Sequence, residues 1–233
     1  MSEKEKIIDQ IAEASGKTAD AVREMVKLID RVIGGPLEEA AGIWQDKLKY
    51  TRAVNQLKLR DRFQDHLARR GLSEPTRAVP LSFAVPLLQA ATLEEDEYLR
   101  DMWAAMLTNA ADERVEVELR RAFVSLLEDM TSLDAQILKV IGDAPPLDSY
   151  SEALQVGFYI GYLPEKAAPM DNSESGQPFP SKEVFLSVSN LLRLNLLRTS
   201  DTLDGIRKDL EVDLTYLGEE LLRLCSTELE QGE

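Results

Sequence analysis

Cysteine and histidine are almost missing from this chain of 233 residues, which has one of each. Cys225 alone cannot form an internal disulfide, which favours a reducing compartment, and we interpret it as a small buried hydrophobe. One thiol and one imidazole are too few for the usual zinc sites. Any serine or cysteine triad would need His66, which we interpret as a surface residue beside Asp65. We therefore expect no metal, no cofactor and no enzymatic activity.

Long apolar runs are missing as well. No segment approaches the roughly 18 apolar residues of a membrane-spanning helix, and the opening MSEKEKIIDQ lacks the apolar core of a signal peptide. The uncharged stretch 78–93 comes nearest in length, but Pro80, Pro86 and Gln89 favour a buried segment. Integral membrane insertion is therefore disfavoured, and we expect a cytoplasmic protein.

Basic residues are outnumbered, with 27 Lys and Arg against 42 Asp and Glu and a net charge of −15. The exception is the segment 47–70, in which eight basic residues stand against two acidic ones. It forms a candidate interaction face for nucleic acid, acidic lipid or acidic protein. We favour the alternative, a solvated helix face in a very acidic protein, so nucleic-acid binding is the weaker interpretation. The eight residues are Lys47, Lys49, Arg52, Lys58, Arg60, Arg62, Arg69 and Arg70.

What the chain does contain is a central stretch, 78–112, that is typical of a helical core. Its first part, 78–93, is uncharged, and Thr92 with Glu95 then predicts a capping box at the start of a helix. Carboxylates fill the first turn of this helix, where they suit the helix dipole. Apolar residues follow at helical spacing and predict a buried face: Leu99, Met102, Trp103, Met106, Leu107 and Ala110.

Helical periodicity continues on both sides of the central stretch. A glycine, Gly71, is placed to end the longest of these predicted helices. We assign all of them to an N-terminal helical domain, 1–129. The predicted helices cover 4–14, 18–33, 36–70 and 115–129.

The pattern after Thr131 differs. Thr131 predicts a capped helix start, and residues 142–180 form a long insertion rich in Pro, Gly, Ser and Asp. A second helix, capped by Ser181, ends before Asn195, which is expected in the left-handed conformation. Two short strands at 196–199 and 211–214 should then pair antiparallel, with Thr215 capping a last helix. This order predicts a winged-helix-like domain, 130–233, with a short β-hairpin in a mainly α protein.

Three parts of the chain carry a family resemblance. They are GPLEEAAGIWQDKLKYTRAVNQLKL at 35–59, VPLSFAVPLLQAATLEEDEYLRDMWAAMLTNAAD at 79–112, and the C-terminal set MTSLDAQIL, SNLLRLNLLRTS and DLTYLGEELLRLC. Together they resemble the bacterial abortive-infection alpha (Abi-alpha) proteins, which are associated with phage defence. The resemblance implies a defence protein of uncharacterised chemistry, and it supplies no catalytic residues, so none are assigned.

We therefore expect abortive-infection-type antiphage defence through protein–protein interaction, with a partner that is phage-derived or a neighbouring defence protein. Two alternatives stay open: a DNA-binding regulator acting through the winged helix, and a membrane-active effector acting through residues 36–93. The expected recognition helix, 182–194, argues against DNA because Lys182 and Arg193 are its only cations. A homo-oligomer also stays open.

Overall fold

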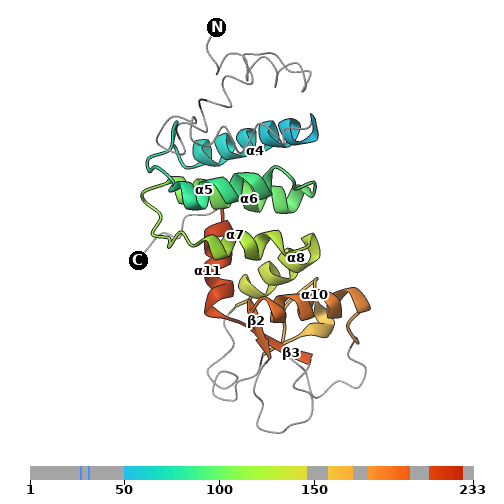
Figure 1. The fold of residues 1–233 in the computed structure, drawn as a ribbon. Helices are drawn as coiled ribbons and strands as arrows, with labels where there is room; N and C mark the ends of the chain where they lie inside the picture. The colour runs from blue at the N-terminus through green and yellow to red at the C-terminus, as the bar shows by residue number, and fades with distance from the viewer. Residues whose placement is uncertain are drawn as a thin grey trace. The chain divides into compact units, whose positions relative to one another are not determined.

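The computed structural model describes residues 50–145, 157–169, 178–199 and 210–227, together with Lys27 and Arg31. It is mainly helical with a small antiparallel sheet of three strands, which confirms the expected fold class (Figure 1). The chain divides into two compact units. Unit 1 comprises Met1–Glu128 and Leu224–Glu233, and unit 2 comprises Asp129–Arg223.

Some predicted elements lie outside the described residues. They are the helix at 4–14, most of the helix at 18–33 and the first part of the helix at 36–70.

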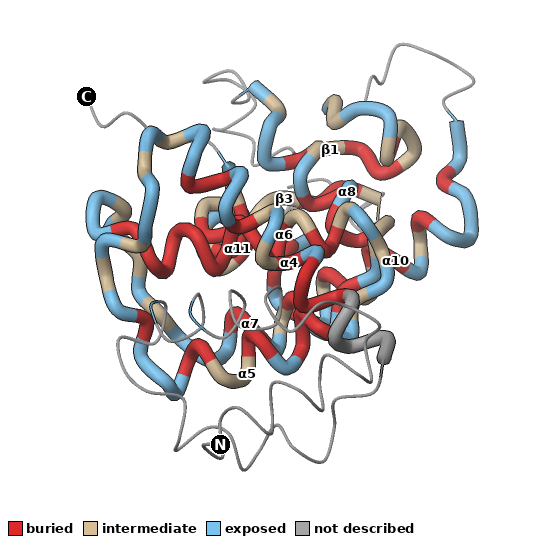
Figure 2. The backbone as a smooth tube through the Cα atoms, turned by 90° about the horizontal axis from the view of Figure 1, so that it is seen from above, coloured by how far each residue is buried: buried red, intermediate tan, exposed pale blue. Residues whose placement is uncertain are grey.

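Four helices form the described part of unit 1 up to residue 128: α4 (Tyr50–Arg69), α5 (Leu81–Ala91), α6 (Glu97–Ala111) and α7 (Arg121–Glu128). Helix α6 packs on α4 and α5, and α5 also packs on α7. Figure 2 shows α6 buried over most of its length. After its first two residues, Glu97 and Tyr98, all of its residues are buried except Asp101, which has intermediate exposure. Trp103 and Met106 are fully enclosed, as the periodicity predicts. Each such side chain contributes about 1.5–3 kcal/mol through burial.

The start of α6 differs from the prediction. Thr92 does not cap it, because α5 runs on to Ala91 and leaves Thr92 in a helical conformation, where its hydroxyl donates to the Gln89 carbonyl at 3.0 Å. An N-cap needs an extended backbone, which Asp96 has. The Asp96 carboxylate accepts from the amides of Tyr98 and Leu99 at 2.9 and 3.0 Å.

The helix predicted at 115–129 is also shorter than expected, since α7 begins only at Arg121. The preceding sequence VEVELR alternates apolar and charged residues, and intermediate and exposed positions alternate with it. That period of two is typical of extended chain, and the prediction wrongly continued the helix through it. Gly71 ends α4 as predicted, at φ 71°.

Unit 2 contains the sheet, and its described residues include the helices α8 (Ser132–Gly142) and α10 (Lys182–Arg193). The strands are β1 (Phe158–Tyr159), β2 (Leu197–Thr199) and β3 (Glu211–Leu214), in the order β1-β3-β2, and a short 3₁₀ turn, η1 (Ile160–Tyr162), follows β1. Helix α11 (Tyr216–Cys225) follows β3.

The predicted hairpin is confirmed, with Leu197 opposite Leu214. Strand β1 was not predicted, and it lies inside the segment 142–180 that was read as an insertion.

Local signals place the helices of unit 2. Thr131 and Asp134 form a reciprocal capping box on α8, and Ser181 accepts from the Val184 amide at the start of α10. Asn195 has φ 57°, the left-handed conformation expected at the end of α10. Thr215 caps α11 by accepting from the Gly218 amide at 3.1 Å. All of these caps agree with the prediction.

Candidate functional site

The predicted basic face of eight residues is only partly described. Lys47 and Lys49 lie outside the described residues, and so does the side chain of Arg52. Arg69 is exposed at the end of α4. The other four side chains contact acidic residues of unit 1: Lys58, Arg60, Arg62 and Arg70.

A row of opposite charges joins α4 to α6. Lys58, Arg62 and His66 lie one turn apart along α4, and they face Glu97 and Asp101, one turn apart on α6. Lys58 Nζ lies 3.5 Å from Glu97 Oε1, and His66 Nε2 lies 3.1 Å from Asp101 Oδ1. Arg62 pairs with Glu97, and this hydrogen bond is the main cause that lowers the Glu97 pKa. We call these five residues the α4–α6 charge seam.

Arg70 belongs to a second, buried cluster in unit 1. Its side chain is 3% exposed, lies 3.5 Å from the fully buried Asp112, and donates to the Ser226 carbonyl at 3.3 Å. Arg114 donates to the same carboxylate at 2.8 Å, which lowers the Asp112 pKa. Asn109 Nδ2 donates to the carbonyls of Leu224 and Ser226 at 2.7 and 2.9 Å. We call Arg70, Asn109, Asp112 and Arg114 the C-terminal clasp, because it holds the end of α11.

Arg60 differs from its neighbours, since it pairs with the next residue along its own helix. Its guanidinium lies 2.5 Å from Asp61. Of the five described side chains of the predicted face, four are thus engaged in ion pairs, and three of these, Lys58, Arg62 and Arg70, join separate segments of unit 1 at the seam and the clasp.

His66 is buried, so its interpretation as a surface residue is wrong. The side chain is 2% exposed, and burial is the largest of the effects that together lower its pKa. Cys225 is buried as expected, and burial raises the pKa of its thiol. The single imidazole and the single thiol of the chain are therefore both enclosed in protein. Within the described ranges, no three acidic, histidine or cysteine side chains gather in a way that could hold a metal ion.

No helix in the described part of the chain combines the length and the apolar character needed to cross a membrane. The apolar face of α5, which the prediction included in the membrane-active alternative, is buried in unit 1 at Phe83, Leu87 and Leu88.

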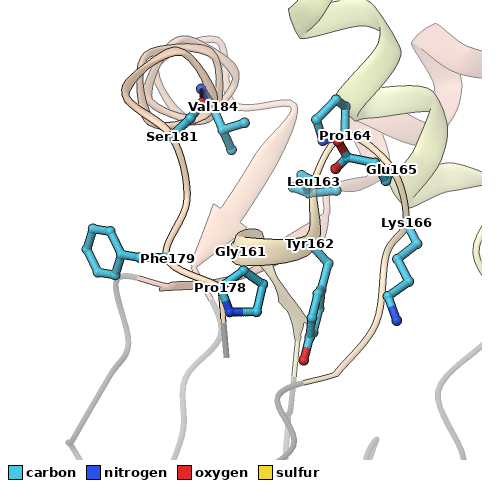
Figure 3. Close-up of a pocket in the computed structure, with 10 residues that line it drawn as sticks. All are labelled: Gly161, Tyr162, Leu163, Pro164, Glu165, Lys166, Pro178, Phe179, Ser181 and Val184. Atoms are coloured by element: carbon cyan, nitrogen blue, oxygen red, sulfur yellow. Dashed lines mark hydrogen bonds between the residues drawn. The ribbon is translucent and has the colours of Figure 1, made fainter. Parts of the chain in front are cut away.

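Unit 2 presents a cavity of about 490 Å³ at the start of α10 (Figure 3). Leu163, Pro164 and Lys166 line it on one side, and Phe179 and Val184 on the other. Tyr162 and Lys166, two of its lining residues, take part in aromatic and cation contacts. The Tyr162 ring packs edge-on against Tyr159 with 5.5 Å between ring centres, and Lys166 Nζ lies 4.6 Å from the Tyr162 ring.

Two apolar residues near the start of α10 are strongly exposed, and one of them, Phe179, also lines this cavity. Phe179 is 74% exposed and packs on Phe185 of α10, with 5.5 Å between ring centres. Leu186, the next residue of α10, is 62% exposed. We call Phe179, Phe185 and Leu186 the α10 apolar patch. Sequence reasoning missed it, because the periodicity predicts that Phe185 faces inward with Val184 and Val188, whereas Phe185 is half-buried and packs on Phe179. Leu186 lies off that inward row and could have indicated the patch.

Charges of both signs flank the α10 apolar patch. Lys182 and Glu183 are exposed at the start of α10. Arg193, at its end, pairs with Asp129 at 3.2 Å and donates to Asn190. The outer face of α10 thus has an apolar middle between charged ends of mixed sign.

Comparison with known proteins gives one match. A family model described as "Abortive infection alpha" matches residues 51–225, which is most of the chain and runs from α4 to α11. No curated protein and no solved structure matches it.

Proposed function

The chain belongs to the abortive infection alpha family, and from this premise we propose that it acts in antiphage defence. In defence of this type, an infected cell stops or dies before it releases phage. The proposal further holds that the protein acts by binding another protein and catalyses no reaction of its own. The partner is a phage product or a neighbouring defence protein.

The observation that carries the protein-contact mechanism is the α10 apolar patch. Exposed apolar groups that are grouped together and surrounded by polar residues are typical of protein-binding surfaces. Aromatic side chains such as Phe179 are the residues that most often anchor a partner. Lys182, Glu183 and Arg193 supply the polar rim around the patch. The cavity beside Phe179 offers room for a side chain of the partner.

DNA binding is the second candidate, and the order of the helix and strands along the chain supports it. A winged helix places its recognition helix directly before the hairpin, and α10 directly precedes β2 and β3. Electrostatics favours protein instead, because contacts with phosphate supply much of the affinity of DNA-binding proteins. The outer face of α10 offers Lys182 and the already paired Arg193, and Glu183 opposes them.

Burial of His66 and Cys225 supports the proposal that no catalysis is involved. A general base must reach the proton that it removes, and a thiol acts as its thiolate. Both groups are enclosed, and burial disfavours the charged form of each. The proposal therefore assigns no catalytic residue.

The experiment measures phage plaquing on bacteria that express the full chain. Wild-type protein should lower plaquing efficiency, and Phe179→Asp and Leu186→Asp should each restore it, because a charge in the middle of the patch blocks apolar contact. Gln136→Asp is the matched control, since it puts the same charge on an exposed position of a different helix of unit 2, α8. Circular dichroism should show that all three variants fold.

Affinity capture from infected and uninfected cells then identifies the class of partner. A protein bound by wild type and Gln136→Asp but lost from Leu186→Asp supports the proposal. Recovery of a second copy of this chain would make the patch a homo-oligomer contact. Salt-sensitive binding to generic DNA in a mobility-shift assay, unaffected by Leu186→Asp, would replace protein contact with DNA binding. Equal defence by wild type and both patch variants would contradict the role of the patch.

A further inference from the structure

His66 lies at one end of the α4–α6 charge seam, where its ring joins α4 to Asp101 of α6. Its Nε2 lies 3.1 Å from Asp101 Oδ1, and a carboxylate can only accept a hydrogen bond. Nε2 therefore carries the proton of the neutral imidazole and donates to Asp101. Nδ1 is enclosed and has no hydrogen-bond partner among the described residues. In the neutral ring this nitrogen holds a lone pair, which leaves no donor unpaired.

Protonation would change this arrangement. A proton on Nδ1 creates a buried N–H donor without an acceptor, and it adds a positive charge to a side chain that is 2% exposed. Both changes are costly inside a protein. In the unfolded chain the protonated imidazole is hydrated, so protonation there does not carry either of these free-energy costs. Protonation therefore favours states in which α4 has moved off α6.

The charges around the ring do not remove this cost. From α4, Arg69 and Arg70 repel a charged imidazole, and from α6, Asp101 attracts it. Glu97 of α6 is engaged by Arg62 and Lys58. Helix α5, which also packs on α4, has no charged residue. Burial outweighs the attraction of Asp101, and the folded-state pKa of His66 is lowered from 6.5.

We propose that His66 is an acid-sensitive lock between α4 and α6, which holds unit 1 closed while its imidazole is neutral and loosens it on acidification. The lock is a regulatory device in unit 1. It is independent of the α10 apolar patch, which lies in unit 2.

The pH range follows from the direction of the pKa. The unfolded chain binds a proton at His66 near pH 6.5, and the folded chain does so only at lower pH. Between these two values the unfolded state holds more protons, so stability falls as the pH falls. The ratio of folded to unfolded protein drops by up to tenfold per pH unit there. Below the folded pKa both states are protonated and this loss ends.

Nuclear magnetic resonance tests the first half of the proposal without ambiguity, because the full chain has one histidine and hence one imidazole signal. We expect the folded protein to titrate below pH 6.5 and Nε2 to carry the proton in the neutral form. Asp101→Asn should lower the pKa further, since it removes the attracting charge. Arg69→Gln should raise it, since it removes a repelling one. An imidazole that titrates at 6.5 or above would overturn the lock.

Hydrogen exchange and urea unfolding between pH 7.5 and 5.5 test the second half. Wild-type protein should lose protection in α4 and α6, after correction for intrinsic exchange, while α10 keeps it. His66→Gln retains an N–H donor but does not titrate, so its stability should lack the wild-type loss over this range. Equal pH dependence in the two proteins would refute the proposal. If His66→Gln does not fold, the comparison passes to Asp101→Asn, whose loss of stability must continue to a lower pH than that of wild type.

Discussion

Two substitutions, Arg70→Gln and Arg69→Gln, test whether the basic residues at the end of α4 stabilise the protein from inside or lie on its surface without a structural role. The two arginines are neighbours in sequence, yet Arg69 is exposed while the Arg70 side chain is 3% exposed. Arg70 lies 3.5 Å from the buried carboxylate of Asp112 and donates to the Ser226 carbonyl at 3.3 Å. Both substitutions remove one positive charge, so the net charge of the two variants is identical.

The expected magnitudes differ widely. Removing one partner of a buried ion pair costs about 3–5 kcal/mol when the other charge is left alone. Asp112 keeps Arg114 at 2.8 Å, which reduces the expected loss for Arg70→Gln to about 2–3 kcal/mol. Arg69→Gln is a surface change and should alter the free energy of unfolding by no more than about 0.5 kcal/mol.

Urea unfolding followed by tryptophan fluorescence measures this difference. The chain has two tryptophans, so Trp44→Phe in all samples leaves Trp103 of α6 as the reporter for unit 1. For a urea dependence of about 2 kcal/mol per molar, Arg70→Gln should lower the midpoint by about 1 M or more. Arg69→Gln should leave it in place. Equal midpoints for the two variants would refute the structural role of the clasp.

Two further expectations concern unit 2 and the end of α11. Gly218→Ala should destabilise the protein by about 1–3 kcal/mol in urea unfolding followed by circular dichroism, because a Cβ there would lie 2.4 Å from the Leu196 carbonyl oxygen. Gly142→Ala is its control and should cost less, since the nearest atom is the movable end of the Leu222 side chain; an equal cost would contradict this reasoning. Cys225 should react with Ellman's reagent only as fast as the protein opens, because burial raises its pKa. In a Cys225→Ser background, Thr227→Cys at an exposed position should react at once, and rapid reaction of native Cys225 would show that the thiol is accessible.

The elements of unit 2 could be predicted from sequence because short-range signals define them. Thr131, Ser181 and Thr215 each cap a helix through an amide at most three residues away. Asn195 ends α10 in the conformation that its own side chain favours. Such signals need no knowledge of the rest of the molecule. Strand β1 escaped prediction because two residues are too few to show a pattern.

The state of the charged residues in unit 1 could not be predicted, because it depends on partners far along the chain. His66 meets Asp101 across 35 residues, and Arg70 meets Asp112 across 42. A helical wheel of α4 separates an apolar face from a basic one, but it does not show that a second helix with carboxylates at the matching spacing covers the basic face. The predicted interaction face was therefore drawn from residues that partly serve the packing of α4 on α6.

The cap of α6 was missed for a different reason. Thr92, Asp96 and the acidic residues between them offer competing starts for one helix, and local propensity accepts both Asp and Thr as N-caps, with Asp the better of the two. The position at which α5 ends decides between these starts. Helix α5 ends at Ala91, and Thr92 is its C-cap with a helical backbone, so Thr92 cannot also be the N-cap of α6.

The bond between Asn109 and Leu224 joins residues that are 115 positions apart, so unit 1 is completed by a segment made long after the rest of it. At about 5–20 residues per second, the ribosome needs roughly 6–23 seconds to travel that distance. During this time the carboxamide of Asn109 lacks the carbonyl groups that it later binds. A product released early by an interrupted ribosome contains α4, α5 and α6 but not their C-terminal closure. Completion of synthesis therefore supplies the last of the polar contacts that Asn109 makes in unit 1.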